Sequence, residues 1–178
     1  ILRDLRAVTH VGSAPALLVA RADFPASSPA EFFALAKANP GKYSYGSPSV
    51  NSNGHRAGEA LKQAVGLDLV HVPFKGGAPA TAALLGGQIT LMMATPTGFQ
   101  QHIASGRLKV IGVSRAKRFP TNPEAPTFAE SGASGFDMVE WWPLTAPAQT
   151  PGALVERIHR DTAAAVKQGD FYRRMIDL

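Results

Sequence analysis

The sequence contains no cysteine, and it also lacks features that mark membrane spans and common catalytic sites. Without cysteine, disulfide bonds and thiolate metal ligands are excluded, although the compartment is not fixed. No run approaches the roughly 20 apolar residues that a membrane-spanning helix needs. No two of the five histidines have metal-ligand spacing such as H-x-x-x-H, and no G-x-S-x-G elbow or paired-carboxylate motif is present. The sequence therefore favours binding over catalysis, and we expect no metal or other cofactor.

Charged residues are also few, at 17% of the 178 residues, whereas hydrophobic residues make up 45%. This composition is typical of a globular chain with a buried core. The net charge of +5 suits an anionic partner. Only Arg115, Lys117 and Arg118 cluster, and no basic stripe interleaved with aromatic residues is present. A small anion is therefore a better fit than nucleic acid.

Short apolar segments bounded by Gly or Pro alternate with segments of helical pattern. We expect strands over residues 7–12, 16–21, 43–47, 69–73, 89–93 and 108–113. The first helix begins with Ser28, Pro29 and Glu31, which form a capping-box pattern, and further helices separate the later strands. Strands that alternate with helices predict an α/β fold with a mainly parallel sheet covered on both faces.

The pattern changes in the last third of the chain. Residues 114–136 are rich in Pro, Gly and Ser and predict a long crossing segment. Residues 137–147 predict a pair of strands. Pro151 is expected to open a long helix, and Asp170 to cap a final amphipathic segment.

Three loops that follow predicted strands carry hydrogen-bond donors. The carboxyl ends of parallel strands meet at one edge of a sheet, and the helix N-termini there attract anions. Residues 46–54 are a run of hydroxyl, amide and glycine residues, residues 74–77 place Lys75 before two glycines, and Thr95 follows the third strand. Each loop alone also fits a solvated turn, with Lys75 a surface lysine and Thr97 a helix N-cap. Together the loops predict an anion site at this edge.

Four motifs in these segments point to a known family. They are Y-x-S at Tyr45 to Ser47, H-x-A-G-E at His55 to Glu59, V-H-V-P-F-K-G at Val70 to Gly76, and L-L-G-G-Q at Leu84 to Gln88. In this order and spacing, the motifs resemble the solute receptors of tripartite tricarboxylate transporters, also called the Bug family. Residues 114–136 and 140–151 resemble the second half of the same family.

The resemblance implies a two-lobe, clamshell (Venus flytrap) periplasmic-binding-protein fold with the ligand between the lobes. It implies a periplasmic protein, not itself membrane-spanning, that delivers a small carboxylate to the permease subunits of a transporter. Family ligands are mono-, di- or tricarboxylates held largely by backbone and hydroxyl donors. Carried over by position, the ligand-binding residues are Ser47, Ser49, Asn51, Ser52, Phe74, Lys75, Gly76 and Thr95.

This chain departs from the family pattern at three points. Phe74 replaces the common Tyr and removes a phenol hydroxyl, and Ala94 stands where many members carry Asp, which favours a plain carboxylate over a ligand with an ammonium group. The family's N-terminal lobe segment is expected to be missing. We therefore predict that residues 1–19 and 114–178 belong to an incomplete first lobe, and that residues 20–113 form a complete second lobe.

Two alternatives to the receptor hypothesis stay open at this point. One is an enzyme on an α/β scaffold that uses His55 or His71, although no catalytic motif accompanies either residue. The other is a non-binding fragment that self-associates to cover exposed apolar surface.

Overall fold

The computed structural model describes residues 3–96, 98–120, 122–168 and 171. Two compact units make up the chain: one comprises residues 15–140, and the other comprises the segments before Pro15 and after Glu140. Thr97 and Asp170, which were predicted to cap helices, lie outside the described residues. The division of the chain between the two lobes of a complete protein stays a prediction.

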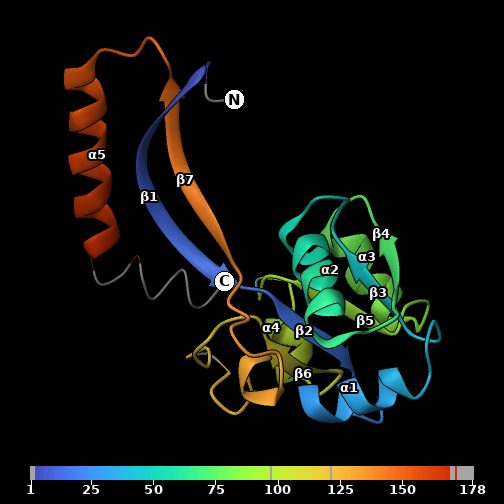
Figure 1. Cartoon of the computed structure of the whole chain (residues 1–178). Helices are drawn as coiled ribbons and strands as arrows, with labels where there is room; N and C mark the ends of the chain where they lie inside the picture. Colours follow the sequence, from blue (N-terminus) through green and yellow to red (C-terminus); the bar gives the residue numbers. More distant parts are fainter. Residues whose placement is uncertain (1–2, 97, 121, 169–170, 172–178) are drawn as a thin grey trace. The chain divides into compact units, whose positions relative to one another are not determined.

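A five-stranded sheet forms the centre of the larger unit (Figure 1). Its strands are β2 (Leu17–Arg21), β3 (Ser44–Ser47), β4 (Val70–Pro73), β5 (Leu91–Ala94) and β6 (Leu108–Val113). The spatial order is β4-β3-β5-β2-β6, with β3 parallel to β4 and β5. Strand β2 lies between β5 and β6 and is antiparallel to both, so the sheet is mixed. A fully buried strand is a continuous apolar run in either direction, and the pattern therefore could not reveal this reversal.

Helices cover both faces of this sheet, as the alternation of elements predicted. They are α1 (Pro29–Lys37), α2 (Asn53–Val65), α3 (Gly77–Leu85) and α4 (Gln100–Ala104). Alternate residues of β2 point to opposite faces, because side chains alternate along a strand. Leu18 packs in the core with α1 and α2, whereas Leu17 and Val19 pack in a second core with α3 and the start of α4.

The helix ends follow from local sequence. The Ser28 hydroxyl accepts a hydrogen bond from Glu31 N–H (3.3 Å), and Glu31 Oε2 accepts one from the N–H of Ser27 (2.7 Å). The predicted capping box therefore forms, with its return bond one residue earlier than usual. Helix α2 ends at Gly66, whose φ of 68° is a left-handed conformation that glycine adopts without strain.

The smaller unit contains most of β1 (Leu5–Pro15), most of β7 (Val139–Pro147) and α5 (Gly152–Lys167). Strands β1 and β7 form a two-stranded sheet, and their arrows point in opposite directions (Figure 1). The predicted pair of strands within residues 137–147 is wrong, because this segment is a single strand whose partner lies at the other end of the chain. Within the part of the chain that the structure describes, no helix is long and apolar enough to cross a membrane.

Candidate functional site

The three predicted loops meet at the carboxyl edge of the sheet, where the parallel strands β3, β4 and β5 end. The N–H of Gly76 donates to the Pro48 carbonyl (2.8 Å), which joins the loop after β4 to the loop after β3. Gly54, at the start of α2, packs so closely on β5 that a Cβ there would lie 1.8 Å from the Met93 carbonyl oxygen. The structure therefore brings together the loops that contain the predicted site residues.

The serines of the first loop hold its shape. Ser47 is fully buried, and its hydroxyl donates to the Ser49 carbonyl (3.0 Å). The Ser52 hydroxyl donates to the same carbonyl (2.7 Å) and accepts from His55 N–H as the cap of α2. Since a hydroxyl has one proton, neither serine has a further proton to give to a ligand. Ser49 is exposed and accessible to a ligand. Contact of a ligand with any of these serines stays a prediction.

Two stacked histidines, His55 and His71, form hydrogen bonds with the same loop. The ring centroids of His55 and His71 lie 4.1 Å apart at 22°. His71 Nε2 lies 2.7 Å from Ser47 Oγ, and in the tautomer with its proton on Nε2 it donates to the serine oxygen while the serine proton goes to Ser49. Asn51 has a left-handed φ of 62°, and its backbone N–H donates to His55 Nδ1 (3.0 Å). Burial, with the neighbouring His55, lowers the pKa of His71 and keeps the imidazole neutral.

A polar chain continues from these rings to the far side of α2. The Tyr45 ring packs against His71 at 4.8 Å, and its hydroxyl donates to Glu59 Oε1 (2.7 Å). Burial, and then the bond to Glu59, raise the pKa of Tyr45, so the phenol keeps its proton. Burial alone would raise the pKa of Glu59, but hydrogen bonds from Lys62 and Tyr45 hold it below its usual value. This series of contacts fixes the positions of the Tyr45 and His71 rings and contains no reactive group.

Asn53 is a site residue that the sequence reasoning did not single out. Its side chain is 5% exposed at the first turn of α2, and neither its Nδ2 nor its Oδ1 has a hydrogen-bond partner among the described residues. A buried amide without partners costs free energy that a bound ligand or water would recover. The sequence placed Asn53 in the donor loop, but burial and the missing partners are visible only in the structure.

Phe74, Lys75 and Gly76 form the second loop. Lys75 is exposed, and no hydrogen bond or ion pair to it is found within the described part of the chain. Gly76 has a φ of 119° and precedes α3, whose first N–H groups have no partner within the helix. The Phe74 ring packs against the core shared by α3 and β5. At this position the chain therefore has a ring that packs against the core and has no hydroxyl.

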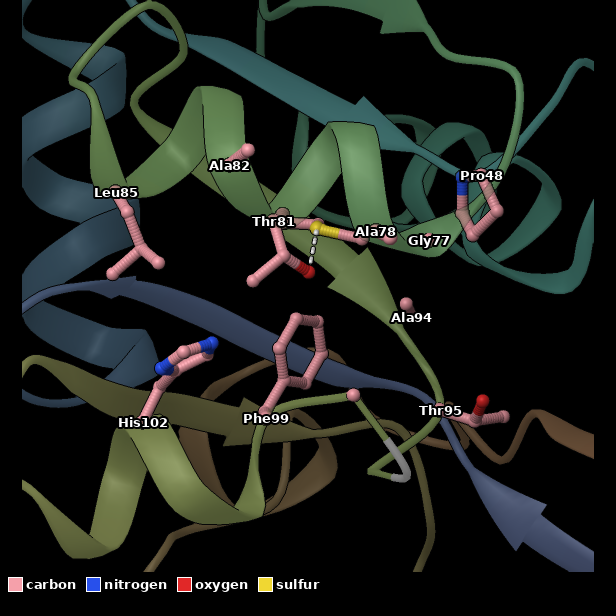
Figure 2. Close-up of a pocket in the computed structure, with 12 residues that line it drawn as sticks. Pro48, Gly77, Ala78, Thr81, Ala82, Leu85, Ala94, Thr95, Phe99 and His102 are labelled. Atoms are coloured by element: carbon pink, nitrogen blue, oxygen red, sulfur yellow. Dashed lines mark hydrogen bonds between the residues drawn. The ribbon is translucent and has the colours of Figure 1, made fainter.

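Thr95 lines a pocket of about 510 Å³ that opens beside these loops. Pro48 and Gly77, from the first two loops, line the same end of the pocket (Figure 2). The pocket continues between α3 and α4 toward Leu85 and His102. Of the predicted residues, Thr95 alone lines this pocket directly.

The geometry does not support the enzyme hypothesis. The Ser47–His71 distance suits a nucleophile and base, but the serine is buried and its proton is directed at Ser49. Across the described residues, no group of three or more His, Asp or Glu side chains could hold a metal ion. The edge instead brings together the starts of α2 and α3 and the exposed Lys75, which suit an anion, while the Asn53 amide is buried at the start of α2.

Comparisons with known proteins agree with this chemistry. The family model for the tripartite tricarboxylate transporter family receptor matches residues 1–177. The structure is similar to R. palustris Rpa4515 with adipate, with a TM-score of 0.92 and 27% identity, over 99% of this chain and 59% of that one. It is similar to the periplasmic binding protein BugD, with a TM-score of 0.86 and 34% identity, over 97% and 57% of the two chains.

A third similar structure is MatC from Rhodopseudomonas palustris with bound malate, with a TM-score of 0.86 and 27% identity, over 97% of this chain and 59% of that one. These similarities confirm the predicted α/β periplasmic-binding-protein fold class. The chain spans about half the length of the curated relatives it matches. The match over nearly all of its residues shows that this chain belongs to the tripartite tricarboxylate transporter receptor family.

Proposed function

We propose that this chain is part of a periplasmic receptor that binds a small carboxylate and delivers it to the permease subunits of a tripartite tricarboxylate-type transporter. The observation that carries this proposal is the family match over residues 1–177. The chain's own chemistry supports it, since the three converging loops offer donors and a positive charge. Two similar structures hold the carboxylates adipate and malate, which makes a carboxylate the ligand class to test first.

The ligand carboxylate accepts hydrogen bonds at the edge where α2 and α3 begin. The unpaired N–H groups at a helix start carry positive partial charge. Asn53 Nδ2 is a buried donor at the start of α2, and Lys75 adds a full positive charge that forms no ion pair within the described part of the chain. The hydroxyls of Ser47 and Ser52 and the imidazoles of His55 and His71 hold the first loop in the binding conformation.

Calorimetric titration with adipate, malate and citrate tests this function. Lys75→Gln is expected to weaken binding of the best acid about fivefold, since an exposed charge near a ligand contributes about 1 kcal/mol. Lys37→Gln is the matched control, because Lys37 is also exposed and lies on α1 away from the loops. It should bind like the unmodified chain.

If none of the three acids gives a measurable heat of binding, or if both lysine substitutions weaken binding equally, a carboxylate site at these loops is refuted. Location has its own test. Fractionation of cells that produce the protein should recover it in the periplasmic fraction, and recovery with the cytoplasm would refute that part of the proposal.

A further inference from the structure

The 510 Å³ pocket is larger and more apolar than a short carboxylate requires. Small-molecule sites commonly occupy about 300–1,000 Å³ and are lined mainly by apolar groups with a few placed polar ones. Met92, Ala94 and Phe99 form a buried apolar part of the lining, and Ala78 and Ala82 of α3 form part of its exposed rim. The lining belongs entirely to residues 15–140, so the pocket is a property of one compact unit.

The pocket is lined mainly by apolar residues, with Thr95 at one end and the polar Thr81 and His102 farther along it. The end that contains Thr95 lies at the carboxyl edge of the sheet, where Pro48 and Gly77 also contribute to the lining (Figure 2). From there it runs between α3 and α4, and the Thr81 and Phe99 side chains point toward one another across it. A molecule whose carboxylate sits at the edge would therefore direct its remaining atoms into an apolar channel.

Two hydrogen-bond donors lie inside this channel. Thr81 is 7% exposed, and its hydroxyl contacts Met92 Sδ at 3.8 Å, a weak acceptor. His102 Nδ1 lies 2.7 Å from Arg107 Nη2, and because a guanidinium only donates, Nδ1 must accept. The neutral ring then carries its proton on Nε2, which is a donor without a partner among the described residues. An oxygen on the ligand's far part would satisfy either donor.

Resting on the proposed function, we propose that the ligand is a carboxylate with an apolar tail, aromatic or of comparable aliphatic size, and that the tail occupies the pocket between α3 and α4. The tail contacts Met92, Leu85 and Phe99. An oxygen substituent on the tail meets the Thr81 hydroxyl or His102 Nε2. Short acids such as malate fill only the edge.

Backbone amide NMR with paired probes tests this inference on the 178-residue chain. Propionate and 3-phenylpropionate share a carboxylate and differ by one ring, and 3-phenylpropanamide keeps the ring without the charge. Propionate is expected to shift the amides of residues 49–54 and 75–77, and 3-phenylpropionate to shift those and also Thr81, Phe99 and His102. The ring should tighten binding about tenfold, since burying an aromatic group removes considerable apolar surface from water.

A blocking variant adds a second readout. Ala82→Trp fills the rim of the pocket from an exposed position on α3, and should reduce the affinity for 3-phenylpropionate to that for propionate. Ala34→Trp, at an exposed position on α1, is the matched control and should change neither affinity.

Each remaining outcome overturns a defined part of the account. If both acids bind equally and shift only the loops, the tail pocket is refuted and the receptor function stands. If 3-phenylpropanamide binds as tightly as 3-phenylpropionate, the pocket is a general apolar cavity and the inference fails. If neither acid shifts any backbone N–H signal, the inference and the carboxylate site fail together.

Discussion

At the scale of single residues, burial of the Asn53 amide has the clearest cost in the free energy of folding. Its amide is buried at the start of α2 with no hydrogen-bond partner among the residues that the structure describes, and such groups destabilise a fold unless a ligand or water bonds them. Asn53→Leu removes both polar atoms and keeps the number and branching of the side-chain heavy atoms. We expect it to raise the free energy of unfolding by about 1–2 kcal/mol while weakening carboxylate binding at least about tenfold.

Chemical denaturation and calorimetry on the same preparation measure these opposite changes. Asn39→Leu is the matched control, because the Asn39 amide already bonds the Leu35 carbonyl at 3.0 Å and its loss should destabilise the chain. An Asn53→Leu chain that binds normally would remove this residue from the site.

The lowered pKa of His71 predicts a specific pH dependence. Burial and the nearby His55 disfavour its charged form in the folded state. As pH falls below about 6.5, the unfolded chain takes up a proton that the folded chain resists, so stability decreases. We expect the free energy of unfolding to fall between pH 7 and pH 5, and this fall to be smaller in His71→Gln.

Urea midpoints measured across that range check the sign. The lowered pKa values of Glu59 and Glu130 keep those carboxylates out of this window. Burial raises the pKa of Glu140, which opposes the effect of His71 as pH falls, but it does so equally in each variant, so the difference between variants reports on His71. His10→Gln, at an exposed position of the other unit, should keep the original slope. An unchanged slope in His71→Gln would mean that another group causes the pH dependence.

The residue scale also shows where sequence reasoning stops. Residue types and spacing identified the first loop, and the structure places that loop at the expected edge. Which atoms remain available there depends on hydrogen-bond direction, and that is set by tertiary contacts. Ser47 was predicted to contact the ligand, and this stays a prediction, because its proton goes to the Ser49 carbonyl. Asn53 was not singled out, yet its buried amide has no hydrogen-bond partner among the described residues.

At the scale of elements, the contact of α2 with β5 determines whether the site assembles. Gly54 allows the helix start to touch the Met93 carbonyl, and a Cβ at that position would overlap it at 1.8 Å. Gly54→Ala must therefore push α2 away from β5, and we expect a loss of about 2–4 kcal/mol of stability together with weaker carboxylate binding.

Gly77→Ala provides the comparison in the same unit. No atom lies within 4 Å of a Cβ added there, so thermal unfolding should change little. If Gly54→Ala were as stable as Gly77→Ala, the close contact of α2 with β5 would be refuted.

Elements were predicted well where local signals decide them. The capping residues of α1 and the strand at residues 108–113 lie where the pattern placed them. The direction of β2 and the partner of β7 were not predictable in the same way. Both depend on which strands meet over long sequence separations, and periodicity carries no information about that.

At the scale of the whole molecule, the larger unit contains both hydrophobic cores and all the candidate ligand contacts described above. The smaller unit has a two-stranded sheet and one long helix, with only a few buried apolar side chains such as Ala146 and Val155. Such a sheet has marginal stability by itself. Ligand effects on the larger unit should therefore dominate the measurable stability of this chain.

Thermal unfolding of this chain with and without carboxylates tests the central claim most directly. A ligand at about 100 times its dissociation constant adds about 2.7 kcal/mol, which corresponds to about 5–10 °C for a chain of this size. The account predicts such a shift with at least one mono-, di- or tricarboxylate, and a smaller shift in Lys75→Gln. No shift with any acid at millimolar concentration would contradict carboxylate binding by these loops.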